Sequence, residues 1–106
     1  MPVATIFYYR NTLMNIEQEN TEKKGFFKAI EGLKEAGVMT YVWAGPGKII
    51  IDHTEVNPDF SGKGIGKALV LKAVDYAREN KIKILPLCPY AQSVFDKDAG
   101  LSDVLF

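Results

Sequence analysis

A glycine-rich turn that joins an apolar strand to an amphipathic helix constrains the fold of this chain more than any other feature. The turn, SGKGIGK at 61–67, follows a β-forming run at 48–56. A helix is predicted over 64–80, because small and apolar residues recur at helical spacing through that segment. A short strand is predicted over 82–87, where Pro86 removes a ladder hydrogen bond near the end. This order of elements predicts a parallel, right-handed βαβ unit.

The segments before this unit are predicted to form an antiparallel meander that leads into the strand at 48–56. Runs of β-forming residues at 25–31 and 38–43 are bounded by short turns that contain glycine. The mostly polar segment 15–24 is expected to hold a short strand followed by a turn. A last short helix is expected over about 89–97, because proline suits the first turn of a helix. The expected fold class is therefore α/β.

Composition limits the classes of partner. A chain of 106 residues with 47% hydrophobic residues forms one domain around a single modest core. Its 13 basic and 13 acidic residues cancel, so neither nucleic acid nor an anionic membrane is an expected partner. The single cysteine, Cys88, excludes an intrachain disulfide and a cysteine-rich metal site. With no signal-peptide pattern and no bilayer-length apolar run, we expect a cytoplasmic protein without a metal. Composition leaves the oligomeric state open.

The glycine turn has the properties of a phosphate-binding loop. Glycines let backbone N–H groups approach a ligand closely, and the start of the following helix favours anions. The pattern is not a P-loop, because Ser61 and Ala68 stand where that motif needs a glycine and a hydroxyl. It is not the dinucleotide fingerprint either, because Lys67 replaces the third glycine. A glycine-rich turn that binds no ligand is the structural alternative.

Residues 61–66 resemble the Q/R-x-x-G-x-G/A loop that binds the acyl-CoA pyrophosphate in the GNAT superfamily of N-acetyltransferases. Ser61 departs from that pattern, which removes one side-chain contact but leaves the backbone amides and the helix dipole. The sequences HTEV at 53–56 and PLCPYA at 86–91 look like the paired signatures of a short GNAT-like subfamily. The resemblance implies a GNAT-like domain over residues 15–106. Residues 1–14 are then an N-terminal extension, either an extra strand or a segment upstream of the true start.

The resemblance implies a compact GNAT-like fold, in which the meander is followed by two parallel strands that splay apart to admit the pantetheine arm of acetyl-CoA. The backbone of Val56 would pair with that arm and polarise the thioester carbonyl. The acceptor would be an amine, for example a protein lysine or terminus. A CoA-binding module without turnover, or a structural interaction domain, are the alternatives. The residues implied in cofactor binding are Val56, Ser61, Gly62, Lys63, Gly64, Ile65, Gly66, Lys67 and Pro89.

Cys88 and Tyr90 are candidates for the chemistry of transfer. Cys88 is expected where the last strand meets the last helix, and a helix N-terminus lowers the pKa of a thiol. It can accept the acetyl group covalently or simply line the cofactor pocket. Tyr90 lies two residues further on, in a region where GNAT enzymes often use a tyrosine to protonate the departing thiolate. Its structural alternative is packing under the last helix.

His53 and Glu55 are candidates for moving a proton. His53 is the only histidine, and strand alternation is expected to place it on one face with Ile49, Ile51 and Glu55. There it can serve as a general base or activate Cys88, with Glu55 orienting the ring. A hydrogen-bonded structural histidine and a solvated carboxylate are the alternative interpretations.

Overall fold

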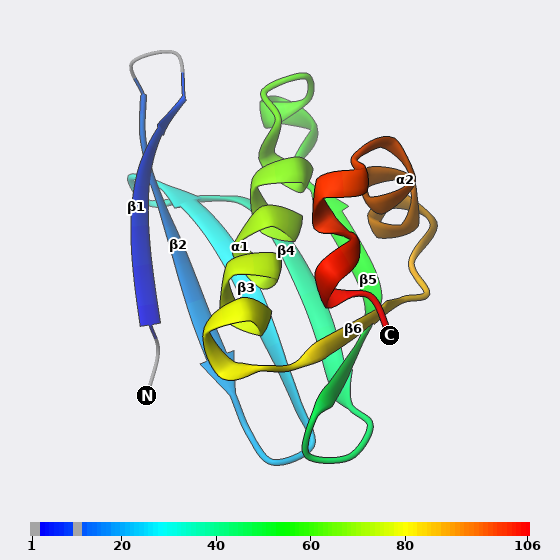
Figure 1. Cartoon of the computed structure of the whole chain (residues 1–106). Helices are drawn as coiled ribbons and strands as arrows, with labels where there is room; N and C mark the ends of the chain where they lie inside the picture. Colours follow the sequence, from blue (N-terminus) through cyan, green and yellow to red (C-terminus); the bar gives the residue numbers. More distant parts are fainter. Residues whose placement is uncertain (1–2, 10–11) are drawn as a thin grey trace.

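The computed structural model describes residues 3–9 and 12–106 (Figure 1). Within these residues six strands form one sheet in the order β1-β2-β3-β4-β5-β6. The first five strands are antiparallel neighbours, and β6 runs parallel to β5. The strands are β1 (Val3–Tyr9), β2 (Thr12–Asn20), β3 (Lys24–Glu31), β4 (Lys34–Trp43), β5 (Lys48–Val56) and β6 (Lys83–Pro86).

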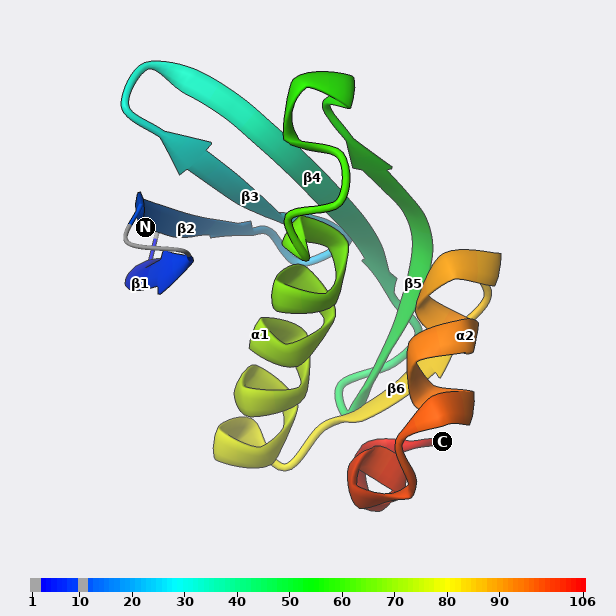
Figure 2. The same ribbon diagram turned by 90° about the horizontal axis from the view of Figure 1, so that it is seen from above.

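Two helices pack against each other on one face of this sheet (Figures 1 and 2). Helix α1 (Ile65–Asn80) connects β5 to β6, and α2 (Pro89–Lys97) follows β6. Two 3-10 turns, η1 (Pro58–Phe60) and η2 (Ala99–Val104), complete the described elements. None of the helices in the described ranges is long and apolar enough to cross a membrane.

The core lies between α1 and the helix-covered face of the sheet. Buried and partly exposed residues alternate along β3 and β4, as in an antiparallel sheet with one covered face. The sheet contributes Met14, Ile16, Phe27, Ala29, Met39, Tyr41, Ile49 and Ile51. Helix α1 contributes Ile65, Leu69, Val70, Ala73, Val74 and Ala77. On the other face of the sheet, the described residues form no helix (Figure 2).

The α/β prediction, with a meander, a parallel βαβ unit and a short C-terminal helix, is confirmed. Several boundaries differ from the expectation. Strand β2 has nine residues instead of being short, because its polar side chains alternate with buried ones. Strand β4 begins at Lys34 and not at Val38, since pairing with β3 extends to the turn. Strand β6 is shorter than 82–87 and ends at Pro86, which has no N–H to donate.

The N-terminal strand continues the same sheet. Strand β1 pairs with β2 from Val3↔Gln18 to Tyr9↔Thr12. Strand β2 therefore crosses the expected boundary between residues 14 and 15, and the division of the chain there stays a prediction. Residues 1–2 and 10–11 of the expected extension lie outside the described residues.

Candidate active site

Strands β5 and β6 part in the middle of β5. Their parallel pairing ends at Ile51↔Pro86, whereas β5 continues to Val56. The amides of Leu87 and Cys88 both donate to the Ile51 carbonyl at 3.0 Å, and the chain then turns into α2. The second half of β5 therefore has an edge that β6 does not cover. The resemblance to GNAT enzymes implies this separation of two parallel strands.

The ladder of β4 and β5 decides which backbone groups face that edge. The Asn57 amide donates to the Ala36 carbonyl at 2.9 Å, and antiparallel pairs alternate between bonded and non-bonded. With Glu55 opposite Val38, the backbone groups of Glu55 point toward β4. Those of Thr54 and Val56 then point toward the uncovered edge. An extended ligand can therefore pair with Val56 as an additional strand does.

The glycine loop presents backbone N–H groups at the start of α1. Gly62 and Gly64 adopt φ angles of 77° and 76°, a left-handed conformation that side-chain-bearing residues rarely adopt. The first hydrogen bond of the helix runs from the Ala68 amide to the Gly64 carbonyl at 3.0 Å. The three amides between them precede the helical ladder and point toward the helix N-terminus. This donor set fits a pyrophosphate.

Gly66 is glycine for a different reason. A Cβ atom at this position would lie 2.7 Å from the ring and hydroxyl atoms of Tyr90. Tyr90 of α2 thus packs on the first turn of α1, with its hydroxyl at the glycine loop. Burial raises the pKa of Tyr90, although the residue remains 41% exposed.

Lysines lie beside the groove between α1 and α2. A cavity of about 260 Å³ between α1 and α2 includes Lys67 and Lys97 in its lining. The other lining residues are Tyr90, Ser93, Val94 and Asp98. The ammonium of Lys63 lies 5.1 Å from the centroid of the Phe60 ring, within range of a cation–π contact at η1. The cavity combines two lysines and the Tyr90 hydroxyl with one acidic residue, Asp98, so its lining carries a net positive charge that suits a phosphate-bearing ligand.

Cys88 is the residue immediately before α2 and is 6% exposed. Its Sγ lies 3.5 Å from the Oγ1 of Thr54. Burial raises the pKa of the thiol, but the nearby Ala91 amide, the Thr54 hydroxyl and the Tyr90 and Thr54 amides favour the thiolate and outweigh burial, so the pKa is lowered. The sulfur forms no capping bond of regular geometry with α2, so the amides of the helix start lower the pKa by electrostatic attraction to the thiolate. The expected position at a strand–helix junction is confirmed.

The expectation that His53 shares a face with Ile49 and Ile51 is wrong. Tyr41 pairs with Ile51 and Thr40 pairs with His53, so Asp52 is an extra residue in β5. Such a β-bulge shifts the alternation of side chains by one position. His53 is therefore on the face of Thr40, which the helices do not cover.

The bulge brings Thr54 to Cys88 in place of His53. Thr54 pairs with the fully buried Met39 and so lies on the helix-covered face. His53 keeps its predicted neighbour, since its Nε2 lies 3.3 Å from Oε2 of Glu55 and both side chains are exposed. Thr54 is a functional candidate that alternation alone missed, because nothing in KIIIDHTEV marks the bulge.

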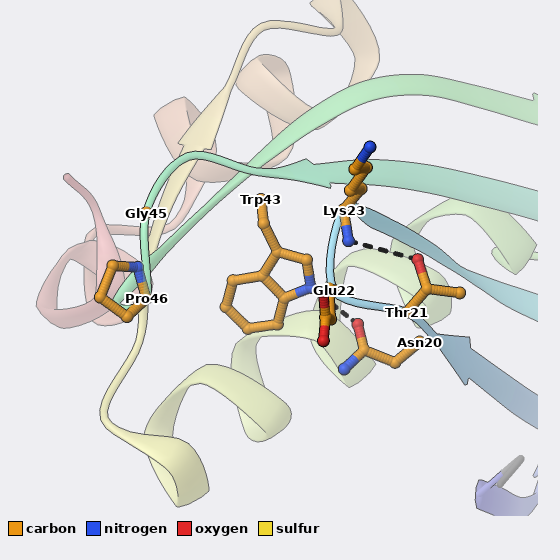
Figure 3. A pocket seen from close by; sticks show the side chains of 7 residues that line it. All are labelled: Asn20, Thr21, Glu22, Lys23, Trp43, Gly45 and Pro46. Carbon is orange, nitrogen blue, oxygen red and sulfur yellow. Dashed lines mark hydrogen bonds between the residues drawn. The ribbon is translucent and has the colours of Figure 1, made fainter.

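A larger cavity lies at the opposite end of β5 (Figure 3). Its volume is about 740 Å³, and the sequence patterns did not indicate it. The lining residues are Asn20, Thr21, Glu22, Lys23, Trp43, Gly45 and Pro46. In the described part of the chain, no group of three or more His, Cys, Asp or Glu residues is arranged to hold a metal ion.

Comparison with known proteins identifies relatives of this chain. The NATD1 protein of Xenopus tropicalis is 29% identical over 75 residues, which cover 71% of this chain and 69% of the relative. The NATD1 protein of Bos taurus is 27% identical over 88 residues, covering 83% and 77%.

Solved structures show the same fold. The solution structure of a GCN5-like protein from Staphylococcus aureus has a TM-score of 0.63 at 30% identity, covering 84% of this chain and 86% of that chain. A ribosomal-protein-alanine N-acetyltransferase from Brucella melitensis has a TM-score of 0.61 at 22% identity, covering 71% and 60%. The model of the GCN5-related N-acetyl-transferase family matches residues 25–104, a range that includes the open edge of β5, the glycine loop and Cys88. The chain therefore belongs to the GCN5-related N-acetyltransferase family.

Proposed function

We propose that this protein transfers an acetyl group from acetyl-CoA to an amine. One observation carries the proposal: the uncovered edge of β5 leads from the glycine loop at the start of α1 to Cys88 at the start of α2. A phosphate-type loop, an extended backbone edge and a buried thiol follow one another along this path. Acetyl-CoA has the matching order of pyrophosphate, pantetheine amides and thioester.

The chain offers a separate set of contacts to each part of the cofactor. The amides of Ile65, Gly66 and Lys67 would hold the pyrophosphate, supported by the lysine side chains around the 260 Å³ cavity. The backbone of Val56 would pair with the pantetheine amides. Its N–H would also stabilise the negative charge that develops on the thioester oxygen. Cys88 would lie beside the acetyl group.

The chemistry is attack of a neutral amine on the thioester carbonyl. A C–N bond forms, the C–S bond breaks, and the sulfur of CoA leaves as a thiolate that takes up a proton. Tyr90 is our proposed donor of that proton, since burial raises its pKa and keeps the hydroxyl protonated. His53, next to Glu55 on the uncovered face, is our proposed base for the amine. This role requires no contact between His53 and Cys88.

The acceptor side is shallow, which favours an exposed amine such as a protein lysine or terminus. Strand β2 ends at Asn20 and β3 begins at Lys24, so only residues 21–23 connect them. A turn of this length contributes no helix that could enclose a small metabolite beside the acetyl group. An amine on a larger molecule needs no such enclosure.

The test measures binding and turnover separately. Acetyl-CoA should raise the melting temperature of the protein, and free CoA thiol should appear only when an amine is added. Lysine-containing peptides and free amino-terminal peptides are the first acceptors to compare, with product identified by mass. Absence of a thermal shift would contradict the CoA assignment. Binding without thiol release from any amine would instead identify a CoA-binding module.

A further inference from the structure

Thr54 lies where the helix-covered face of β5 meets the start of α2. The bulge at Asp52 puts it there, because Thr54 then pairs with Met39 on the buried side of the sheet. Without the extra residue, strand alternation would place His53 at this point instead. The side chain of Thr54 is half-buried, so it lies at the wall of the splay and not in open solvent.

The hydroxyl of Thr54 contacts the sulfur of Cys88 over 3.5 Å between Oγ1 and Sγ. The backbone of Cys88 is held in place by the bond from its amide to the Ile51 carbonyl. The sulfur is therefore positioned by a backbone hydrogen bond of its own residue, and the hydroxyl by the place of Thr54 opposite Met39 in the β4–β5 ladder. A threonine hydroxyl both donates and accepts hydrogen bonds, so it can pair with the thiol and with the thiolate.

We propose that Thr54 is a positioning residue that orients the Cys88 sulfur at the end of the uncovered β5 edge and donates a hydrogen bond to it when the thiol ionises. The relevance of this contact to acetyl transfer rests on the proposed function. The contact itself exists without acetyl-CoA, so it can be tested alone.

Removing the hydroxyl changes one of several donors to the sulfur. The amides of Tyr90, Ala91 and Thr54 remain, and so do the titratable side chains on the surrounding elements. Those side chains are Tyr90 on α2, Lys67 on α1, Lys83 on β6, and His53 and Glu55 on the opposite face of β5. We therefore expect Thr54→Val to raise the midpoint of thiol ionisation by about half to one pH unit. Thr54→Ser keeps the hydroxyl and should restore the midpoint.

The experiment is the rate of iodoacetamide alkylation against pH, followed by intact mass. Cys88 is the only cysteine of the chain, so the rate reports on this thiol alone. The matched control is Thr40→Val on β4, which removes a strand hydroxyl bonded to Asp52 at 2.6 Å on the opposite face. Wild type, Thr54→Val, Thr54→Ser and Thr40→Val are compared, each with a circular dichroism spectrum.

A raised midpoint in Thr54→Val, with Thr54→Ser and Thr40→Val unchanged, supports the proposal. An unchanged Thr54→Val, a Thr54→Ser shifted as far as Thr54→Val, or an equal shift in Thr40→Val overturns it. Should Thr54→Val not fold, the comparison of Thr54→Ala with Thr54→Ser decides in the same way. A separate arm adds acetyl-CoA to wild type. Failure to slow alkylation there would contradict the proposed place of Cys88 beside the cofactor and leave the Thr54 result standing.

Discussion

The two ends of strand β5 differ in how many neighbouring strands pair with the backbone. At its first residues β5 lies between two partners, with β4 on one side and β6 on the other. Beyond Ile51, β5 pairs with β4 alone among the described strands. The Thr54 amide there approaches the Cys88 sulfur, and the backbone groups of Val56 face the open side. One end of the sheet is complete, and the other keeps donors and acceptors for a ligand.

Side chains complete the closed end. The Gln18 amide donates to the Tyr41 hydroxyl at 2.9 Å, and that hydroxyl donates to Asn20 at 3.0 Å. The Trp43 indole donates to the same Asn20 oxygen at 2.8 Å, as Figure 3 shows. The larger cavity lies beside this network, where several polar groups already have partners. Cavity volume is therefore a poorer guide to function here than the state of the backbone hydrogen bonds.

The largest expected effect is a loss of acetyl-CoA affinity when the glycine loop beside the open end of β5 is altered. Gly64→Val forces a side chain onto a left-handed residue at the start of α1 and should weaken acetyl-CoA binding by about 2–3 kcal/mol, roughly 30- to 150-fold. Gly45→Val carries the same kind of strain at the other end, where φ is 90° and no atom lies within 4 Å. Calorimetric titration of both variants should find the loss only in Gly64→Val. Equal losses would show that strain alone is responsible.

The next largest expected effect is a loss of stability when a hydrogen bond at the closed end is removed. Tyr41→Phe removes the hydroxyl between Gln18, which is 4% exposed, and Asn20, and should cost about 1–3 kcal/mol of unfolding free energy. Tyr76→Phe, a tyrosine of α1 packed edge-on against Phe27, is the matched control and should cost less. Urea unfolding measures both. Acetyl-CoA affinity should stay unchanged in the folded Tyr41→Phe protein. A loss of affinity in this variant would contradict the assignment of ligand binding to the open end alone.

A smaller effect tests the contact that joins α1 to α2 at the open end. Gly66→Ala places a Cβ against the Tyr90 ring and should cost about 1 kcal/mol, at the low end for overpacking, because the ring is partly exposed and can move. The double variant Gly66→Ala with Tyr90→Ala should recover that part of the loss. A double-mutant cycle in urea measures the coupling. If the losses of unfolding free energy from the two substitutions simply add, the Tyr90 ring is not what excludes a side chain at residue 66.

The smallest effect concerns the pH dependence of stability through Cys88. Because the pKa of this thiol is lower in the folded protein than its ordinary value of 9.0, the folded state releases the proton first. Its contribution to stability is therefore present above the ordinary thiol pKa and is lost as the pH falls through the folded value. Unfolding free energies of wild type and Cys88→Ala should accordingly diverge as the pH rises toward 9.0. A constant difference across that window would contradict a lowered pKa.

Patterns of local spacing predicted the elements that form the site. Helix α1 was expected from apolar residues at helical spacing, and α2 from its initial proline. The glycine loop was expected to bring backbone N–H groups to a helix start, and Gly62 and Gly64 do adopt left-handed angles. These features depend on residues that are close in sequence, so each can be predicted from one short segment of the chain.

Patterns of local spacing did not predict which residues distant in sequence come into contact. The role of Gly66 depends on Tyr90, 24 positions later, and could not be read from the loop itself. The neighbour of Cys88 depends on Asp52, an extra residue that is visible only when β5 is aligned against β4.

The sequence by itself determined the order of the elements, the left-handed glycines and the position of the thiol at the end of the last strand. Each follows from backbone conformations and periodicities that neighbouring residues set. Only the tertiary structure decided that Thr54 and not His53 meets the thiol, and that β5 has an uncovered edge beyond Ile51. The physical reason is that strand register is a property of two chain segments together, and one inserted residue exchanges the two faces of a strand.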